Sequence, residues 1–148
     1  MSKLKFIIPT LVALAVSSNV MAAQTFKPHG CPSAAKIQNG NFVFAGLNEN
    51  KYTALQFSNY GGTVLWGFGV SKIEADTAAQ AIQLAIFALG SLSYASGPTF
   101  SEETHSWGCV YNIGHGYKAV ALTSASPKFQ EISAYKLGSA VFIACNKN

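Results

Sequence analysis

The side chains best suited to chemistry gather in residues 105–117. This stretch holds two of the three histidines, one of the three cysteines, two tyrosines and one of the two tryptophans. Imidazole, phenolate and thiolate groups are ligands of haem iron, and the macrocycle also needs an apolar slot. His115 lies between two glycines, so we expect a turn that exposes its imidazole. Trp107, Cys109 and Tyr111 alternate along the chain, which places them on one face of a strand.

Further iron ligands lie near the start of the mature chain. Cys31 precedes Pro32, and this pair resembles the short haem-responsive motif in which a thiolate binds iron. A disulfide at Cys31 would remove that thiolate. The alternative for the strand face is a core or disulfide role, and the alternative for His115 is an ordinary exposed turn. The candidate haem-binding residues are His115, Tyr117, Tyr111, His105, His29 and Cys31.

Other site chemistries fit the sequence less well. A serine or cysteine nucleophile needs a base and an orienting group, and the mature chain has one aspartate, Asp76, which suits a helix cap. Residues His105, Cys109 and His115 do not have the compact spacing of zinc ligands. The sequence has no Gly-x-Ser-x-Gly elbow, His-Glu-x-x-His helix or phosphate-binding loop. We therefore expect no enzyme and no metal-ion site.

The basic residues argue against a nucleic-acid partner. All ten are lysine, they are scattered, and nucleic-acid binders usually present a clustered stripe that includes arginine. The formal net charge is +4, and Lys3 and Lys5 of the leader contribute part of it.

Residues 1–22 have the features of a secretory signal peptide. Two lysines precede an apolar run over residues 6–16, and Ala22 suits the cleavage position. The run is shorter than the roughly 20 residues that a membrane-spanning helix needs. We expect residues 23–148 to form a single compact secreted domain without a transmembrane segment, in the periplasm or outside the cell. The three cysteines, Cys31, Cys109 and Cys145, allow one disulfide in three pairings, and we expect Cys31 to pair with one of the other two.

Periodicity and turn residues predict an α+β fold. It is an antiparallel β-sheet of about five to seven short strands with one long apolar helix packed on one face. The helix spans 77–89, with Asp76 as its N-cap and with Ile82, Ala85, Ile86 and Leu89 on one face, and it should be the most buried element. Helical turns are expected at 32–38, strands at 42–46, 52–57, 63–73, 92–96, 106–112, 117–124 and 139–145, and an extended segment at 131–135.

One face of the strand 63–73 is nearly bare. Leu65, Gly67, Gly69 and Ser71 share it, while the opposite face is aromatic. Strand glycines permit close approach of another backbone or a ligand. We expect the alanine-rich helix 77–89 to pack there, and the alternative is a flat ligand.

Taken together, several short motifs resemble a known group of proteins. They are the leader, Cys31-Pro32, the Trp-Gly-Cys-Val-Tyr strand at 107–111, Gly116-Tyr117 and the terminal Cys145. The chain resembles small exported proteins of intracellular Gram-negative bacteria in the haemin-binding protein family. The resemblance implies haem as the cofactor or cargo, a role in iron acquisition, and an association with virulence. The chain lacks the Tyr-x-x-x-Tyr pair of surface haem receptors, so the resemblance assigns no ligand residues.

The low charge and the many serines and glycines also suit a different function. The alternative is an exported protein-interaction module or secretion-system substrate without a small-molecule ligand. Its partner would be an envelope or host protein.

Overall fold

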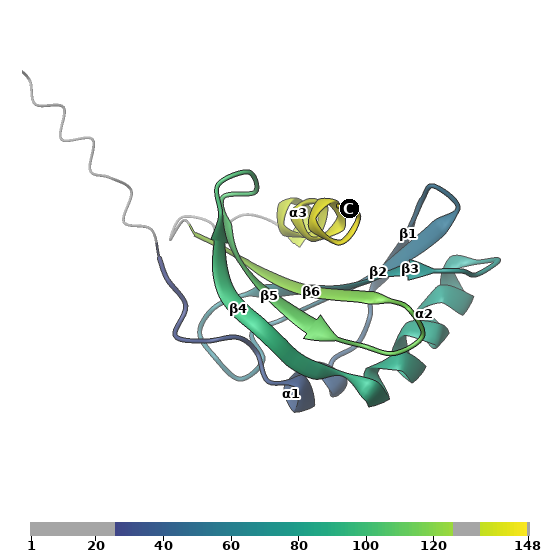
Figure 1. Cartoon of the computed structure of the whole chain (residues 1–148), viewed down its shortest axis with the longest axis horizontal. Coiled ribbons are helices and arrows are strands. Elements are labelled where there is room, and N and C mark those ends of the chain that lie inside the picture. The colour runs from purple at the N-terminus through teal and green to yellow at the C-terminus, as the bar shows by residue number, and fades with distance from the viewer. Residues whose placement is uncertain (1–25, 126–133, 148) are drawn as a thin grey trace, which may run out of the picture.

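The computed structural model describes residues 26–125 and 134–147, and the expected signal peptide at 1–22 lies outside them. The described residues form a six-stranded antiparallel sheet with helices on both faces (Figure 1). The expected α+β class with an antiparallel sheet is confirmed. Each described helix is too short or insufficiently apolar to cross a membrane.

The sheet has the strand order β1-β2-β3-β6-β5-β4, so β1 and β4 form its two edges. The expected hairpin of 52–57 and 63–73 corresponds to β2 and β3, and the pair of strands after residue 105 corresponds to β5 and β6. The strands are β1 (Phe44–Asn48), β2 (Lys51–Ser58), β3 (Trp66–Ile73), β4 (Ser93–Ser101), β5 (Ser106–Asn112) and β6 (Lys118–Ser124).

Two of the expected element boundaries are wrong. The helix α2 (Ala78–Ala88) is capped by Thr77, whose hydroxyl accepts a hydrogen bond from the Gln80 amide at 3.1 Å. Asp76 is therefore not the cap. Its amide donates a hydrogen bond to the Gln80 side chain at 2.7 Å, so the side chains of Thr77 and Gln80 together resemble a capping box. The second wrong boundary is the end of the strand expected at 92–96, because Gly97-Pro98 does not end this strand. β4 continues through this cis peptide bond to Ser101 with shifts in its pairing to β5.

The expectation of one long helix on one face is also wrong. α2 has 11 residues and is followed by the short 3-10 helix η1 (Leu89–Ser91). A second main helix, α3 (Ala134–Cys145), lies on the opposite face, and a short helix α1 (Ala34–Gln38) precedes the sheet (Figure 1). Helices therefore cover both faces of the sheet.

α3 occupies the segment that we expected to be a strand at 139–145. The local run Val141-Phe142-Ile143 is typical of strands. Leu137, Val141 and Cys145, however, recur every four residues and are all buried, so a helix buries them together. Ala134 and Tyr135 also belong to α3, which corrects the extended segment at 131–135 for those two residues, whereas 131–133 lie outside the described residues.

α3, and not α2, packs on the bare face of β3. A Cβ atom at Gly67 would lie 2.8 Å from Val141 Cγ2, and one at Gly69 would lie 2.6 Å from Val141 Cγ1. Ser71 on the same face donates a hydrogen bond from its hydroxyl to the Cys145 carbonyl at 3.0 Å. The glycines thus permit the close approach that we expected, but with a different helix. α3 therefore occupies the bare face of β3, where the alternative expectation was a flat ligand.

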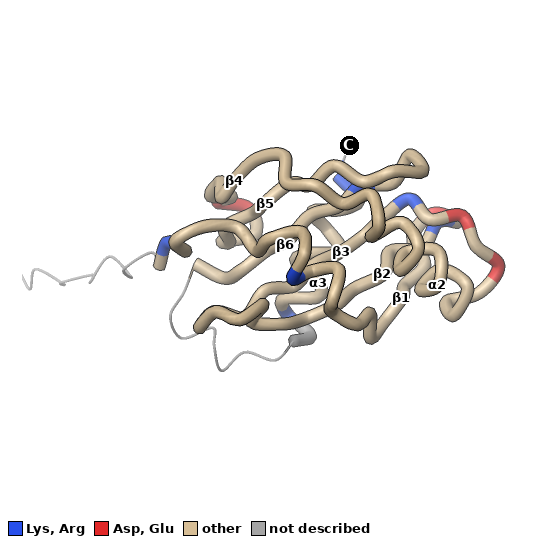
Figure 2. The backbone as a smooth tube through the Cα atoms, turned by 90° about the horizontal axis from the view of Figure 1, so that it is seen from below, with Lys and Arg blue, Asp and Glu red and all other residues tan. Residues whose placement is uncertain are grey.

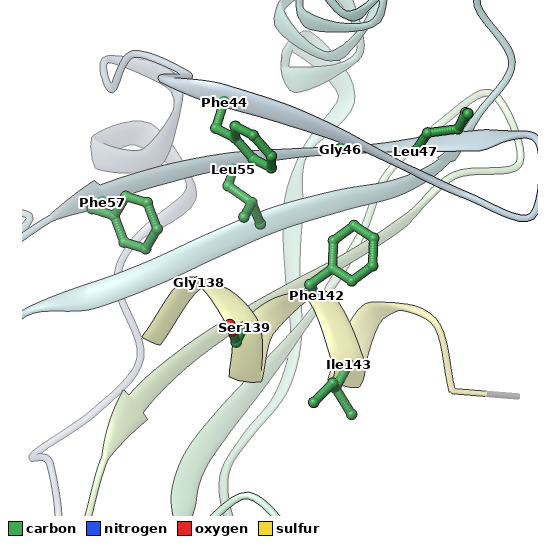
Figure 3. Close-up of a pocket in the computed structure, with 9 residues that line it drawn as sticks. All are labelled: Phe44, Gly46, Leu47, Leu55, Phe57, Gly138, Ser139, Phe142 and Ile143. Atoms are coloured by element: carbon green, nitrogen blue, oxygen red, sulfur yellow. The ribbon is translucent and has the colours of Figure 1, made fainter. Parts of the chain in front are cut away.

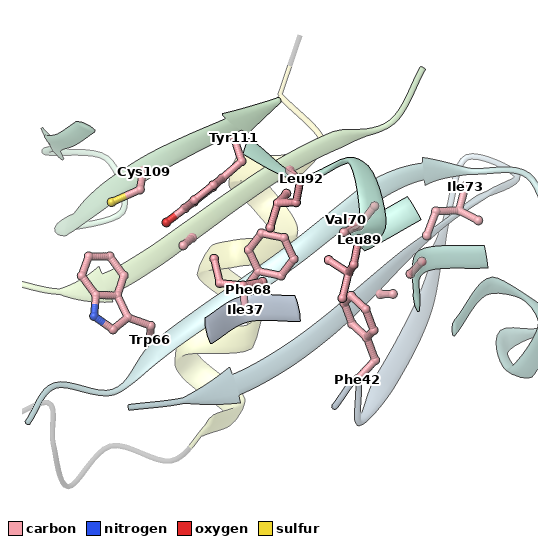
Figure 4. Close-up of a cluster of buried hydrophobic side chains, with 14 of the residues drawn as sticks. Ile37, Phe42, Trp66, Phe68, Val70, Ile73, Leu89, Leu92, Cys109 and Tyr111 are labelled. Carbon is pink, nitrogen blue, oxygen red and sulfur yellow. The ribbon is translucent and has the colours of Figure 1, made fainter. Parts of the chain in front are cut away.

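The larger core lies on the α2 face of the sheet (Figure 4). α2 contributes Ala81, Ala85 and Ala88, whereas Ile86 is 49% exposed and Phe87 is 73% exposed. The helix therefore turns its alanines inward, because small side chains let it approach the sheet, and it is not the most buried element. Large side chains from the sheet, the loops and the other helices fill the core, including Ile37, Trp66, Phe68, Val70, Ile73, Leu89, Leu92 and Tyr111.

A disulfide joins Cys31 to Cys109, which confirms the expected use of Cys31. It ties the N-terminal segment to β5 beside Gly97, where an added Cβ would lie 2.6 Å from the Gly108 carbonyl oxygen. Gly97 also has a φ of 120°, so glycine is needed there for space and for backbone conformation. Cys145 is a free, buried thiol.

Candidate functional site

The structure separates the six candidate haem ligands into different environments. His115 and Tyr117 lie together, with ring centroids 5.7 Å apart, and the ring of Phe87 lies 5.5 Å from that of His115. The Gly114 amide donates to the Ser91 hydroxyl at 2.8 Å, which ties the β5–β6 turn to η1. His115 is exposed, as expected. Phe87 was not among the predicted site residues, although a phenylalanine on the polar side of the expected helix was a signal.

Tyr111 is a core residue and is not free to bind iron. It is 3% exposed, and its hydroxyl donates to the Pro32 carbonyl at 2.5 Å. Its ring meets that of Phe68 edge-on at 5.8 Å. Burial, and to a lesser degree the neighbouring Tyr94, raises the pKa of its hydroxyl well above the usual range, so the phenolate that iron prefers is disfavoured.

Cys31 has no thiolate in the disulfide-bonded protein, because its sulfur is bonded to Cys109. The Cys31-Pro32 pair is therefore not a haem-ligating motif in this state. His29 is exposed two residues before Cys31. It keeps an accessible imidazole without the thiolate beside it.

His105 lines a hollow of about 320 Å³ between the β4–β5 hairpin and α3, which we call the His105 hollow. Its backbone has a φ of 48°, in the left-handed region, and its carbonyl accepts a hydrogen bond from the Ala125 amide at 3.2 Å. Its ring meets that of Phe100 edge-on at 5.7 Å. The lining consists of Glu103, Thr104, His105, Ser106, Ser124, Lys136, Leu137, Ser139, Ala140 and Ile143.

The lining of the His105 hollow combines one histidine, one lysine and an apolar helical wall. Leu137, Ala140 and Ile143 of α3 form the wall, and Lys136 supplies the cation. The Glu103 carboxylate, which would otherwise oppose an anion, forms an ion pair with Lys147. Across the described residues, no group of three or more His, Cys, Asp or Glu side chains could hold a metal ion. Lys136 and the wall were not among the predicted site residues, because a strand and not a helix was expected at 139–145.

Lysines and acidic residues are sparse along the described backbone and do not collect on one element (Figure 2). The ion pairs are few and peripheral. One joins Lys51 to Glu74 at 3.6 Å, and both side chains are largely exposed. Such pairs contribute little to stability.

A second hollow of about 700 Å³ lies on the other side of α3, between this helix and strands β1 and β2 (Figure 3). We call it the apolar groove. Ser139 is the one polar side chain among its lining residues, so the groove suits apolar groups and offers no iron ligand. The lining consists of Phe44, Gly46, Leu47, Leu55, Phe57, Gly138, Ser139, Phe142 and Ile143.

Comparisons with known proteins assign no relative to this chain. No protein-family model matches it. No curated protein matches it either. No solved structure matches it. The geometry of the two hollows and the residue motifs therefore remain the basis for a function.

Proposed function

We propose that the mature chain is an exported haemin-binding protein that assists iron acquisition, and that haemin docks at the His105 hollow. The observation that carries this proposal is a hollow lined by an exposed histidine, an apolar helical wall and a lysine. Haem iron needs one or two axial ligands, and the macrocycle needs an apolar surface. The role is binding, not catalysis.

Each part of haemin has a counterpart among the described residues. His105 would supply the axial nitrogen, and Leu137, Ala140 and Ile143 would contact the macrocycle. Lys136 would pair with a propionate. The volume of about 320 Å³ is near the lower end of the roughly 300–1,000 Å³ of small-molecule sites, so part of the haemin would stay exposed. Partial exposure suits a protein that passes haemin to another carrier.

Titration of haemin into the purified protein of residues 23–148 tests the proposal through the Soret absorption band. We expect saturable binding that His105→Ala weakens by about tenfold or more, which corresponds to about 1.4 kcal/mol or more. Lys136→Ala should weaken binding less, because a partly exposed ion pair contributes little. His115→Ala is the matched control, since it removes the other exposed imidazole that contacts aromatic rings.

Two results would contradict this proposal in different ways. A Soret band that never saturates would refute haemin binding itself. Saturable binding that is lost in His115→Ala but kept in His105→Ala would instead place the haemin at the β5–β6 turn beside Phe87 and Tyr117.

The apolar groove favours a second candidate function, an exported protein-interaction module or secretion-system substrate. Phe44, Leu47 and Ile143 line the groove and are each more than half exposed. A protein partner from the envelope or the host would cover them. Ile143→Asp should abolish capture of such a partner in a pull-down assay, whereas Phe87→Asp, outside the groove, should not. Equal capture by both variants would refute a role for the groove.

Export is part of both proposals. The disulfide is typical of proteins that fold in an oxidising compartment. Together with the signal peptide expected at residues 1–22, it supports a secreted or periplasmic location. Cell fractionation of the full chain, with and without residues 1–22, tests this location; retention of the full chain in the cytoplasm would contradict it.

A further inference from the structure

The two edges of the sheet differ in how they are protected. β4 contains Pro98, and its pairing with β5 shifts register twice. Proline and bulges are devices that prevent an edge strand from pairing with another chain. β1, at the other edge, pairs with β2 in an unbroken register from Phe44↔Leu55 to Asn48↔Lys51. Its outer main-chain groups therefore form a regular template for a further strand.

The side chains of β1 also lack the usual protection. Residues 41–48 contain no ionisable side chain, so no charge opposes a second strand. Val43 is 66% exposed, Phe44 53% and Leu47 59%. A flat apolar edge of this kind is stable in water when another strand covers it.

We propose that β1 pairs antiparallel with β1 of a second copy of this chain, about a two-fold axis through Gly46. This register aligns all five residues of the strand. It sets Gly46 opposite the partner subunit's Gly46, Ala45 opposite the partner's Leu47, and Phe44 opposite the partner's Asn48. The two six-stranded sheets would then form one continuous sheet.

A second copy fits this edge because large side chains meet small ones. The large side chain of Leu47 faces the methyl group of the partner's Ala45. Phe44 lies diagonal to the partner's Gly46, at a separation that aromatic rings can bridge. Gly46 has no side chain on this face, and the Phe44 and Phe142 rings of its own chain cover it, since an added Cβ would lie 2.9 Å from the Phe44 ring and 3.2 Å from the Phe142 ring. The same uncharged strand thus provides both the large side chain, Leu47, and the small one, Ala45, that faces it.

The size of the contact sets the expected strength. Five residue pairs bury less than the roughly 1,600 Å² of a standard stable interface. We therefore expect a reversible dimer that dissociates on dilution in the micromolar range. Haemin plays no part in the contact, so the dimer forms in the ligand-free protein.

Sedimentation velocity of residues 23–148 over a range of concentrations tests the dimer. The apparent mass of the wild-type protein should rise from one copy to two. Leu47→Lys should remain monomeric at every concentration, because two lysines would be buried at the contact. Thr99→Lys adds the same charge to the exposed edge of β4 and should behave as the wild type. A monomeric wild type, or a dimer that Leu47→Lys leaves intact, would overturn the proposal.

Cysteine cross-linking tests the register. Gly46→Cys should form a disulfide-linked dimer on mild oxidation, because the two substituted residues lie directly opposite each other. Asn48→Cys should not, because its counterpart is the partner's Phe44. Comparable cross-linking of the two variants on a non-reducing gel would overturn this register, as would cross-linking of Asn48→Cys alone.

Discussion

Removal of the Cys31–Cys109 disulfide should lower the free energy of unfolding by several kcal/mol. The two cysteines are 78 residues apart in the sequence. In the chain-entropy relation, closing a loop of n residues removes about 2.1 + 1.5R ln n cal/mol/K from the unfolded chain. For this loop the loss corresponds to about 4.5 kcal/mol at 25 °C, and measured bonds often deliver less, so we expect about 2–4.5 kcal/mol.

The native state should keep its other contacts in the double variant Cys31→Ala/Cys109→Ala. The hydrogen bond from the Tyr111 hydroxyl to the Pro32 carbonyl holds the same N-terminal segment against β5. The loss of stability should therefore come chiefly from the greater freedom of the unfolded chain.

Urea unfolding of residues 23–148, followed by tryptophan fluorescence, measures this loss. With a denaturant slope of about 2 kcal/mol/M, a loss of 4 kcal/mol lowers the midpoint by about 2 M. Cys145→Ala is the control, because it removes a thiol without touching the bond. Dithiothreitol should lower the wild-type midpoint toward that of the double variant and should leave the double variant unchanged.

A loss below about 1 kcal/mol, or a wild-type midpoint that ignores dithiothreitol, would refute the reasoning. Either result would mean that Cys31 and Cys109 are not bonded in the folded protein. Cys31 would then regain its thiolate and return as a candidate haem ligand.

Two further predictions concern the contact between α3 and the sheet. Gly69→Val would place a Cβ 2.6 Å from Val141 Cγ1 and 3.0 Å from Cys145 Sγ, so α3 must shift. We expect a loss of about 1–3 kcal/mol in urea unfolding, whereas Gly90→Val, where an added Cβ meets nothing within 4 Å, should cost less; equal losses would contradict the packing. Burial raises the pKa of the Cys145 thiol from 9.0 to about 12. The buried neutral thiol therefore contributes stability below pH 9.0, and this contribution is lost as the pH rises toward about 12. The stability difference between the wild type and Cys145→Ala should shrink over that range, and a constant difference would contradict the assignment.

The strands were predictable because their signals are local. The alternation in β3 and β5, and the paired glycines at the β2–β3 connection, set period and turns within a few residues. Local signals misled at α3, because Val141-Phe142-Ile143 is strand-like and only packing on the sheet selects the helix.

The buried face of α2 was predicted only in part, for a related reason: Ala85 and Leu89 are buried as expected, whereas Ile86 is 49% exposed. Hydrophobicity favours Ile86 on the inside, but a close approach to the sheet favours Ala81, Ala85 and Ala88. The distance between the helix and the sheet depends on tertiary packing, and the helical periodicity of the sequence does not specify it. The sequence could therefore predict that α2 exists and that Ala85 and Leu89 are buried, but not that Ile86 is exposed.

The candidate site was only partly predictable because it depends on α3. His105 was among the candidate ligands by residue type, but His115 stood out because its flanking glycines give a local signal. Lys136 and Leu137 line the same hollow as His105 although about thirty residues separate them in the sequence, and that arrangement needs the helix to lie on the sheet.

The position of α3 explains why this face of the sheet has two hollows. Gly67 and Gly69 draw the helix close to β3, near the middle of the strand order. A single helix is about 10–12 Å wide, and neighbouring strands lie about 4.8 Å apart, so one helix covers only part of a six-stranded sheet. The uncovered strands on one side of α3 leave the apolar groove, and the β4–β5 hairpin on the other side closes the His105 hollow. Ser139 and Ile143 line both hollows, so a displacement of α3 changes them together. The bare strip of β3 therefore has a functional consequence in our proposals, because it sets the helix position that shapes both binding surfaces.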